Sequence, residues 1–250
     1  MSKVYFIGAG PGDPELITLK GYRIIKRADV IIYAGSLIPK EVFKERRQDA
    51  KVIDSSSLNL YEIHKIIKEA VQDGKIVARL HTGDTSIYSA IREQVYLLEK
   101  DNIPYEIIPG VTSAFALAAK TNITFTIPER TQTLIITRVG GKTPVPEKED
   151  LAELAKHNCS MAIYLSANMS EKIKKALLEG GFKETTPVIV GYKVSWPDEK
   201  IFITSIKDLD KEVKAHGIKR QALFLVVPDI DEEITFSKLY SPSFSHSFRR

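Results

Sequence analysis

The stretch KVYFIGAGPGDP (residues 3–14) is a short apolar run followed directly by a glycine-rich turn. This order comes close to the G-x-G-x-x-G fingerprint that opens dinucleotide-binding α/β folds. Gly8 and Gly10 fit the fingerprint, but Asp13 stands at the third glycine position, where its carboxylate would face the pyrophosphate. The next apolar run, residues 29–33, is not followed by the acidic residue that holds a ribose hydroxyl. We therefore predict that the turn binds a ligand without phosphates.

The composition of the 250-residue chain is that of a globular protein, with 43% hydrophobic and 27% charged residues. No apolar run approaches the ~20 residues that span a bilayer, and the N-terminus has no signal-peptide pattern, so we expect a cytoplasmic protein without a membrane partner. Cys159 is the only cysteine and the five histidines form no H-x-x-x-H pair, so we expect no protein-held metal. The net charge of +4 is spread along the chain, which fits an ordinary solvated surface or an anionic small molecule and does not favour nucleic acid.

Short β-rich runs alternate with helical patterns along most of the chain, which predicts an α/β fold: two α/β lobes with mostly parallel sheets and a cleft between them. The strands are expected at residues 3–8, 28–33, 75–81, 104–108, 133–137, 160–165, 188–192 and 222–227. We expect an N-terminal lobe at residues 1–115, a C-terminal lobe at residues 116–230 and a flexible tail, rich in serine and charge, at residues 231–250.

Two more strand-to-loop-to-helix junctions follow the first, RLHTGD (residues 79–84) and PGVTS (residues 109–113). Each alone has the residues of a plain turn or helix cap. Because the carboxyl ends of parallel strands meet at one edge of a sheet, the three loops together predict a ligand site. A further stretch, GGKT (residues 140–143), ends like a P-loop but lacks the first glycine of that motif, because Ile136 occupies the position.

The opening stretch, the RLHTGD loop and the PGVTS junction, taken in order, resemble the tetrapyrrole (corrin/porphyrin) methyltransferases over about residues 3–228. The resemblance implies a class III methyltransferase-like fold, S-adenosyl-L-methionine as the cofactor, an anionic tetrapyrrole as the substrate and a homodimer. Within that family, YAGSL (residues 33–37), PERTQTLIITR (residues 128–138) and GKTPVPE (residues 141–147) are similar to the branch that methylates C11 of precorrin-4 or cobalt-precorrin-4 in cobalamin biosynthesis. One departure is Thr85, where the family usually has proline after T-G-D.

The resemblance also implies residue roles. The cofactor pocket would be lined by Pro11, Thr82, Gly83, Asp84, Ile87, Thr112, Ser113, Leu165 and Ala222. Thr82, Thr112 and Ser113 would supply hydrogen bonds from their hydroxyl groups. Leu165 and Ala222 would contact the adenine from the second lobe. The carboxylates of the macrocycle call for cationic side chains, for which Arg130, Arg138 and Lys142 are the candidates. Asp84, His81 and Glu129 are candidates for a general base, and none is assigned.

Several alternatives stay open at this point. The enzyme could act at another corrin position, on uroporphyrinogen III or on a diphthamide-type protein substrate. A binding module that keeps the α/β lobes without catalysing transfer is a rival of another class. The sequence does not decide whether the substrate carries cobalt, because that metal would arrive with the macrocycle.

Overall fold

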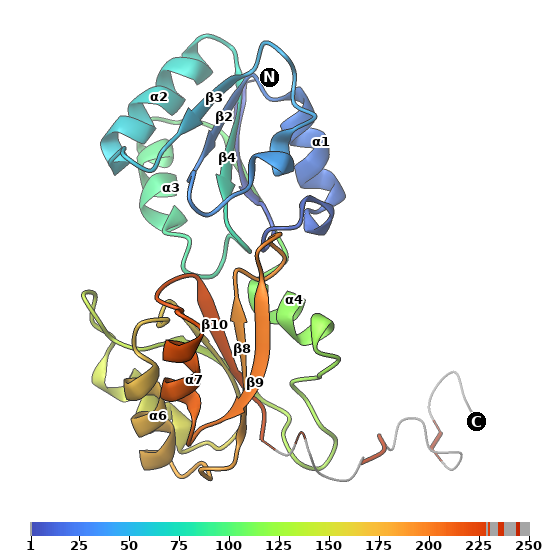
Figure 1. Ribbon diagram of the computed structural model, residues 1–250. Coiled ribbons are helices and arrows are strands. Elements are labelled where there is room, and N and C mark those ends of the chain that lie inside the picture. The colour runs from blue at the N-terminus through green and yellow to red at the C-terminus, as the bar shows by residue number, and fades with distance from the viewer. Residues whose placement is uncertain (1, 229, 231–234, 238–243, 246–250) are drawn as a thin grey trace. The chain divides into compact units, whose positions relative to one another are not determined.

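A computed structural model describes residues 2–228, 230, 235–237 and 244–245 (Figure 1). The chain divides into two compact units. The first unit comprises Met1–Ala116 and Lys193–Asp198, and the second comprises Leu117–Tyr192 and Glu199–Arg250. The tail expected at residues 231–250 lies largely outside the described residues. In the described part of the chain, no helix combines the length and apolar character that a membrane span requires.

The first unit is built on a five-stranded sheet with the strand order β3-β2-β4-β1-β5, and every pairing in it is parallel. Its strands are β1 (Lys3–Gly8), β2 (Val30–Tyr33), β3 (Lys51–Asp54), β4 (Ile76–His81) and β5 (Tyr105–Ile108). The sequence did not reveal β3, because this edge strand has only four residues and begins and ends in an exposed charged residue. The glycine-rich turn follows β1, which has β4 on one side and β5 on the other.

Helices cover both faces of the first sheet (Figure 1). The helical segments of this unit are η1 (Pro14–Leu16), α1 (Leu19–Arg27), η2 (Lys40–Phe43), α2 (Leu60–Gln72) and α3 (Ile91–Lys100), and α4 (Ser113–Lys120) begins in the first unit and ends in the second. Alternate residues of each strand point to opposite faces. Ile7 therefore packs with Ile24 of α1, whereas Phe6 packs with Ile67 of α2 and Leu98 of α3. This two-sided burial explains why the strands read as continuous apolar runs.

The second unit contains a mixed five-stranded sheet with the order β6-β7-β10-β8-β9. Its strands are β6 (Leu134–Arg138), β7 (Ser160–Tyr164), β8 (Pro187–Tyr192), β9 (Lys200–Ser205) and β10 (Ala222–Val226). Its helical segments are η3 (Glu147–Glu149), α5 (Leu151–Ala155), α6 (Ser170–Glu179) and α7 (Leu209–Ala215). One apolar core, with Phe224 and Ile173 among its fully buried members, holds strands and helices together.

The two sheets differ in the relative direction of their strands. The predicted α/β class and mostly parallel pairing are confirmed for the molecule as a whole, since the first sheet and the β6–β7 pair are parallel. The pairs β7–β10, β10–β8 and β8–β9 are antiparallel. β9, a strand that the sequence did not predict, follows β8 without a helix between them and runs back along it, and β10 runs against both β7 and β8.

Candidate functional site

Three loops meet at the carboxyl end of the parallel sheet in the first unit. They follow the adjacent strands β1, β4 and β5 and carry residues 9–13, 82–90 and 109–112. The first two loops are joined by a pair of backbone hydrogen bonds, in which the amide of Gly83 donates to the carbonyl of Gly10 (2.8 Å) and the amide of Gly10 donates to the carbonyl of Gly83 (3.2 Å). The predicted convergence of the first unit's three loops is therefore present in the structure.

The loops approach one another so closely that side chains are excluded from the contact. A Cβ atom on Gly110 would lie 2.2 Å from the carbonyl oxygen of Gly83 and 2.7 Å from the Cα of Gly8. A Cβ atom on Gly8 would lie 2.6 Å from the Cα of Gly110. Backbone cannot yield as a flexible side chain can, so glycine is required at these positions for steric reasons.

The carboxylate of Asp84 ties two of the loops together. Its Oδ2 accepts a hydrogen bond from the amide of Gly110 (2.7 Å), and its Oδ1 accepts one from the amide of Ser86 (2.8 Å) and another from the Ser86 hydroxyl. Burial alone would raise the pKa of Asp84, but the hydrogen bonds from Ser86 and from Gly110 outweigh it and leave the pKa below its ordinary value. Asp84 is thus an ionised residue that positions the loops.

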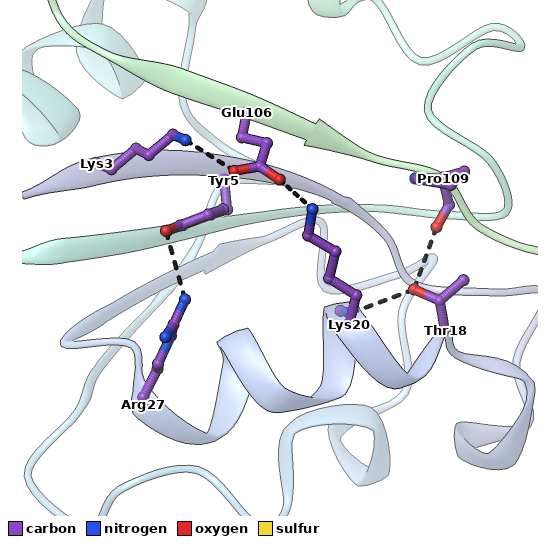
Figure 2. Close-up of polar contacts among 8 residues, drawn as sticks. Lys3, Tyr5, Thr18, Lys20, Arg27, Glu106 and Pro109 are labelled. Carbon is purple, nitrogen blue, oxygen red and sulfur yellow. Dashed lines mark hydrogen bonds and ion pairs between the residues drawn. The ribbon is translucent and has the colours of Figure 1, made fainter.

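The loop after β5 is also held from its other side (Figure 2). The hydroxyl of Thr18 donates a hydrogen bond to the carbonyl of Pro109 (3.4 Å). It also accepts a hydrogen bond from the amide of Gly21 (3.2 Å) at the start of α1. Glu106 of β5 accepts hydrogen bonds from Lys20 of α1 and from Lys3 of β1 (2.7 Å). The hydrogen bond from Lys20, together with the smaller effect of the one from Lys3, lowers the pKa of Glu106 to about 2. The strand β5 and its loop are therefore anchored to α1.

Asp13 has a local structural role in the first loop. Its side chain accepts the amide of Glu15 (2.8 Å) and so caps η1. The carboxylate of Asp13, whose charge is unfavourable for binding a pyrophosphate, is therefore held at the start of η1. Pro11, two residues earlier, is buried.

The helix that follows the second loop, α3, begins only at Ile91. Tyr88 and Ala90, which precede it, both have left-handed backbone with φ of 50°. Of the cofactor residues in this loop, Thr82 is exposed and Ile87 is half-buried. In the third loop Thr112 is buried, and its carbonyl accepts the amides of Phe115 and Ala116 (both 3.2 Å) as α4 begins. Ser113 is the first residue of α4 and is half-buried.

Two buried basic residues lie on β4 just before the second loop. Arg79 donates to the hydroxyl of Ser55 (2.8 Å) and to the amide oxygen of Gln94 (3.2 Å), and burial lowers its pKa to about 10. His81 is 7% exposed, and its Nε2 has no hydrogen-bond partner among the described residues. Burial, followed by the charge of Arg79, lowers the pKa of His81 to about 3, so the imidazole is neutral at pH 7.

Leu165 and Ala222 belong to the second unit, where they lie at one end of the sheet. Ala222 pairs with Tyr192 of β8, and the antiparallel pairing of β10 with β7 runs from Phe224–Ile163 to Val226–Met161, so Leu165 follows directly after the end of β7. Leu165 is 65% exposed with a φ of 53°, whereas Ala222 is buried. Both residues therefore lie towards the same end of the second sheet.

The three cationic residues expected to contact substrate are not all close together. Arg138 ends β6 next to Tyr164, and its guanidinium donates to the carbonyls of Thr143 (3.0 Å) and Pro144 (2.7 Å). It thereby closes the loop that carries the exposed Lys142. Arg130 lies near the opposite end of the sheet, because the neighbouring Thr131 hydroxyl accepts the amide of Ser160, where β7 begins.

One segment of the first unit, Lys193–Asp198, has no local sequence pattern that predicts its place there. It contains the only tryptophan of the chain, Trp196, which touches the glycine-rich turn. A contact between residues 185 positions apart leaves no local pattern, so only the rarity of the residue could have drawn attention to it. The described residues include no group of three or more His, Cys, Asp or Glu side chains arranged to hold a metal ion.

Comparison with known proteins shows which family has these features. The family model of the Tetrapyrrole (Corrin/Porphyrin) Methylases matches residues 3–210. A Methanocaldococcus jannaschii protein named cobalt-precorrin-4 C(11)-methyltransferase is 50% identical over 249 residues, which cover 99% of this chain and 96% of that protein. The X-ray structure of a cobalt precorrin-4 methyltransferase, described as a cobalamin biosynthetic enzyme, matches with a TM-score of 0.88 and 46% identity, over 90% of this chain and 94% of that chain.

A more distant solved structure shares the fold. The uroporphyrin-III C-methyltransferase of Thermus thermophilus, crystallised with S-adenosylhomocysteine, has a TM-score of 0.74 at 24% identity and covers 90% of this chain and 97% of its own. The family model's match to residues 3–210 includes the three loops of the first unit and every strand except β10. The chain belongs to the tetrapyrrole (corrin/porphyrin) methylase family.

Proposed function

We propose that this protein transfers a methyl group from S-adenosylmethionine to C11 of cobalt-precorrin-4 in cobalamin biosynthesis. The observation that carries the proposal is the 50% identity, along almost the whole chain, to a protein named for that reaction. The solved cobalt precorrin-4 methyltransferase, at a TM-score of 0.88, supports the same choice. Methylation at another corrin position or of uroporphyrinogen III is the alternative within the family.

The charge of the three loops supports a sulfonium cofactor. Residues 8–13, 82–85 and 109–113 contain no lysine, arginine or histidine, and they include two carboxylates, Asp13 and Asp84. A dinucleotide would bring phosphates into this acidic surrounding, whereas S-adenosylmethionine brings a positive sulfur. Glycine backbone and hydroxyl groups in the same loops offer donors and acceptors for its uncharged parts. The residues present therefore fit this cofactor.

We propose Pro11, Thr82, Gly83, Ile87, Thr112 and Ser113 as cofactor contacts of the first unit, with Asp84 positioning the loops that carry them. Thr82 and Ser113 have side chains within reach of solvent, which suits hydroxyl groups that must meet a ligand. Leu165 and Ala222 stay a prediction from the resemblance.

Methyl transfer from a sulfonium is a displacement at carbon, in which the bond to the macrocycle forms as the carbon–sulfur bond breaks. Its rate depends chiefly on alignment of the two reactants. Two of the candidate bases are poorly suited to proton transfer at pH 7, because the pKa of His81 is about 3 and that of Asp84 lies below its ordinary range. We therefore propose that the protein acts by positioning and that neither residue is a general base.

The substrate is an anionic macrocycle, and its cobalt would arrive as part of it. We propose that Lys142 contacts substrate carboxylates and that Arg138 shapes the loop on which Lys142 lies. The exposure of Lys142 and the two carbonyl contacts of Arg138 support this division of roles. Arg130 stays a prediction from the resemblance.

A cytoplasmic homodimer completes the proposal. The resemblance to the family supports the dimer, and light scattering coupled to size-exclusion chromatography tests it. A mass near twice the 28.0 kDa of one chain is expected, whereas a mass near 28 kDa would contradict it.

The proposed activity is tested by turnover with S-adenosylmethionine labelled in its methyl group. Cobalt-precorrin-4, precorrin-4 and uroporphyrinogen III are offered separately, and the methylated carbon is located by NMR. A label at C11 of cobalt-precorrin-4 is expected. Binding of the cofactor without transfer to any of the three substrates would favour the non-catalytic alternative.

A further inference from the structure

The segment Lys193–Asp198 links β8 to β9, two strands of the second sheet, yet it belongs to the first unit. Two of its residues, Lys193 and Ser195, have left-handed backbone with φ of 47° and 69°. Such conformations cost energy for residues other than glycine and persist where surrounding contacts enforce them. This turn is therefore held in a particular shape.

Trp196 is the residue that this shape presents to the glycine-rich turn. Its indole Nε1 donates a hydrogen bond to the carbonyl of Pro11 (3.1 Å). A Cβ atom on Gly12 would lie 2.4 Å from Cδ1 and 2.7 Å from Nε1 of the same indole. The ring thus lies directly against the backbone of Gly12, and both Pro11 and Gly12 are buried.

The indole is itself supported by charged neighbours. The ammonium of Lys193 lies 5.5 Å from the centre of the ring, within the range of a cation–π contact. The same ammonium forms an ion pair with Asp198 (2.6 Å), so its position is fixed at the other end of the turn. Lys193 and Asp198 therefore hold the ring against the loop.

The glycine-rich turn is held by two separate sets of contacts. The paired backbone hydrogen bonds to Gly83 hold Gly10, and the indole of Trp196 holds Pro11 and Gly12. A loop that is fixed before binding loses less conformational entropy when a ligand arrives. We propose that Trp196 is a positioning residue for the cofactor, because it fixes residues 10–12, and that its fluorescence reports binding at this turn.

This inference rests on the proposed function, since it takes S-adenosylmethionine as the ligand of the turn. The first test measures S-adenosylhomocysteine binding by calorimetry in the full-length wild type, Trp196→Phe and Trp196→Ala. We expect about tenfold weaker binding for Trp196→Ala and a smaller loss for Trp196→Phe, which keeps the ring and lacks the N–H donor. In turnover, the KM for S-adenosylmethionine rises while kcat at saturating cofactor stays within about twofold.

The second test needs no substitution. Trp196 is the only tryptophan, so its emission on titration with S-adenosylhomocysteine reports this turn alone. We expect the emission to shift with the affinity that calorimetry gives. The matched control is Trp196→Phe combined with Tyr96→Trp, which moves the only tryptophan to an exposed position in the middle of α3. Its emission should not change on the same titration.

The outcomes separate the two proposals. A Trp196→Ala variant that binds within twofold of the wild type overturns the positioning role and leaves the proposed function standing. If that variant does not fold, the wild-type titration decides, and an emission that stays constant while calorimetry detects binding overturns the inference. A wild type that binds no S-adenosylhomocysteine overturns the proposed function, and this inference with it.

Discussion

Asp84 is a residue predicted from the sequence whose carboxylate also holds the loops of the site together. The resemblance to the family implies a place for it in the cofactor pocket, and in the structure its two oxygens accept hydrogen bonds from Gly110 and Ser86. The motif predicts that a carboxylate is needed there. It cannot reveal that one partner, the amide of Gly110, lies in another loop of the site, 26 residues further along the chain.

Replacing Asp84 is expected to weaken cofactor binding through the loops. In Asp84→Ala the amides of Ser86 and Gly110 lose their acceptor, and in Asp84→Asn one of them must face an amide N–H₂ group. Hydrogen bonds to a charged group contribute about 1.5–3 kcal/mol each, so at least a tenfold loss of S-adenosylhomocysteine affinity is expected in calorimetry. The control is Ser86→Ala, which keeps the backbone contact and should bind within about threefold. Wild-type affinity in Asp84→Ala would show that the carboxylate does not support the site.

The lowered pKa of His81 predicts that the free energy of unfolding decreases as the pH falls. In the unfolded chain the imidazole takes up a proton near its ordinary pKa of 6.5, whereas in the folded protein it stays neutral until about pH 3. Its contribution is therefore fully present above pH 6.5 and is lost as the pH falls from 6.5 towards 3. Below pH 6.5 this residue lowers the free energy of unfolding by up to about 1.4 kcal/mol per pH unit.

Urea unfolding of the wild type and of His81→Asn at several pH values between 4 and 7.5 measures this contribution. The variant residue does not titrate, so the difference in free energy between the two proteins should change steadily below pH 6.5. A difference that stays constant over this range would contradict a buried neutral histidine.

Lys142 is expected to affect the substrate and not the cofactor. Replacing it with Ala should raise the KM for the tetrapyrrole about fivefold, because one exposed ionic contact contributes about 1 kcal/mol at most. The affinity for S-adenosylhomocysteine should stay unchanged. The matched control is Lys148→Ala, an exposed lysine in η3, which should leave both values as they are. Equal KM values for the tetrapyrrole in the two variants would show that Lys142 does not contact the substrate.

At the scale of elements, the sequence was most informative where burial is two-sided. The strands β1, β2, β4 and β5 read as apolar runs because helices cover both faces of their sheet. The edge strands β3 and β9 lack this pattern, as each is only partly buried. The start of α3 was also not predictable, since Tyr88 and Ala90 have left-handed backbone although neither is a glycine.

The contact among the three loops predicts which glycines tolerate a side chain. Gly110→Ala should lower the free energy of unfolding by about 3 kcal/mol or more, because its Cβ atom would meet the backbone of both neighbouring loops. Gly140→Ala is the matched control, since its Cβ atom would lie 3.2 Å from a valine methyl group that can shift. Denaturant unfolding measures both, and equal stabilities would show that the loops are not packed as described.

At the scale of the whole molecule, local patterns could identify an α/β chain with two sheets, and the motif order could identify a family. They could not reveal that the second sheet is mixed, because strand direction depends on how distant segments pair. Nor could they assign Lys193–Asp198 to the first unit, since that depends on the contact between Trp196 and the turn after β1. In both cases the missing information is a contact between residues far apart in the chain.

The account as a whole depends on which carbon receives the methyl group. The most direct test is NMR of the product formed from cobalt-precorrin-4 and S-adenosylmethionine carrying a ¹³C-labelled methyl group. The account predicts one new ¹³C-methyl signal, attached at C11, together with one equivalent of S-adenosylhomocysteine. A label at any other ring position, or transfer only to uroporphyrinogen III, would contradict it.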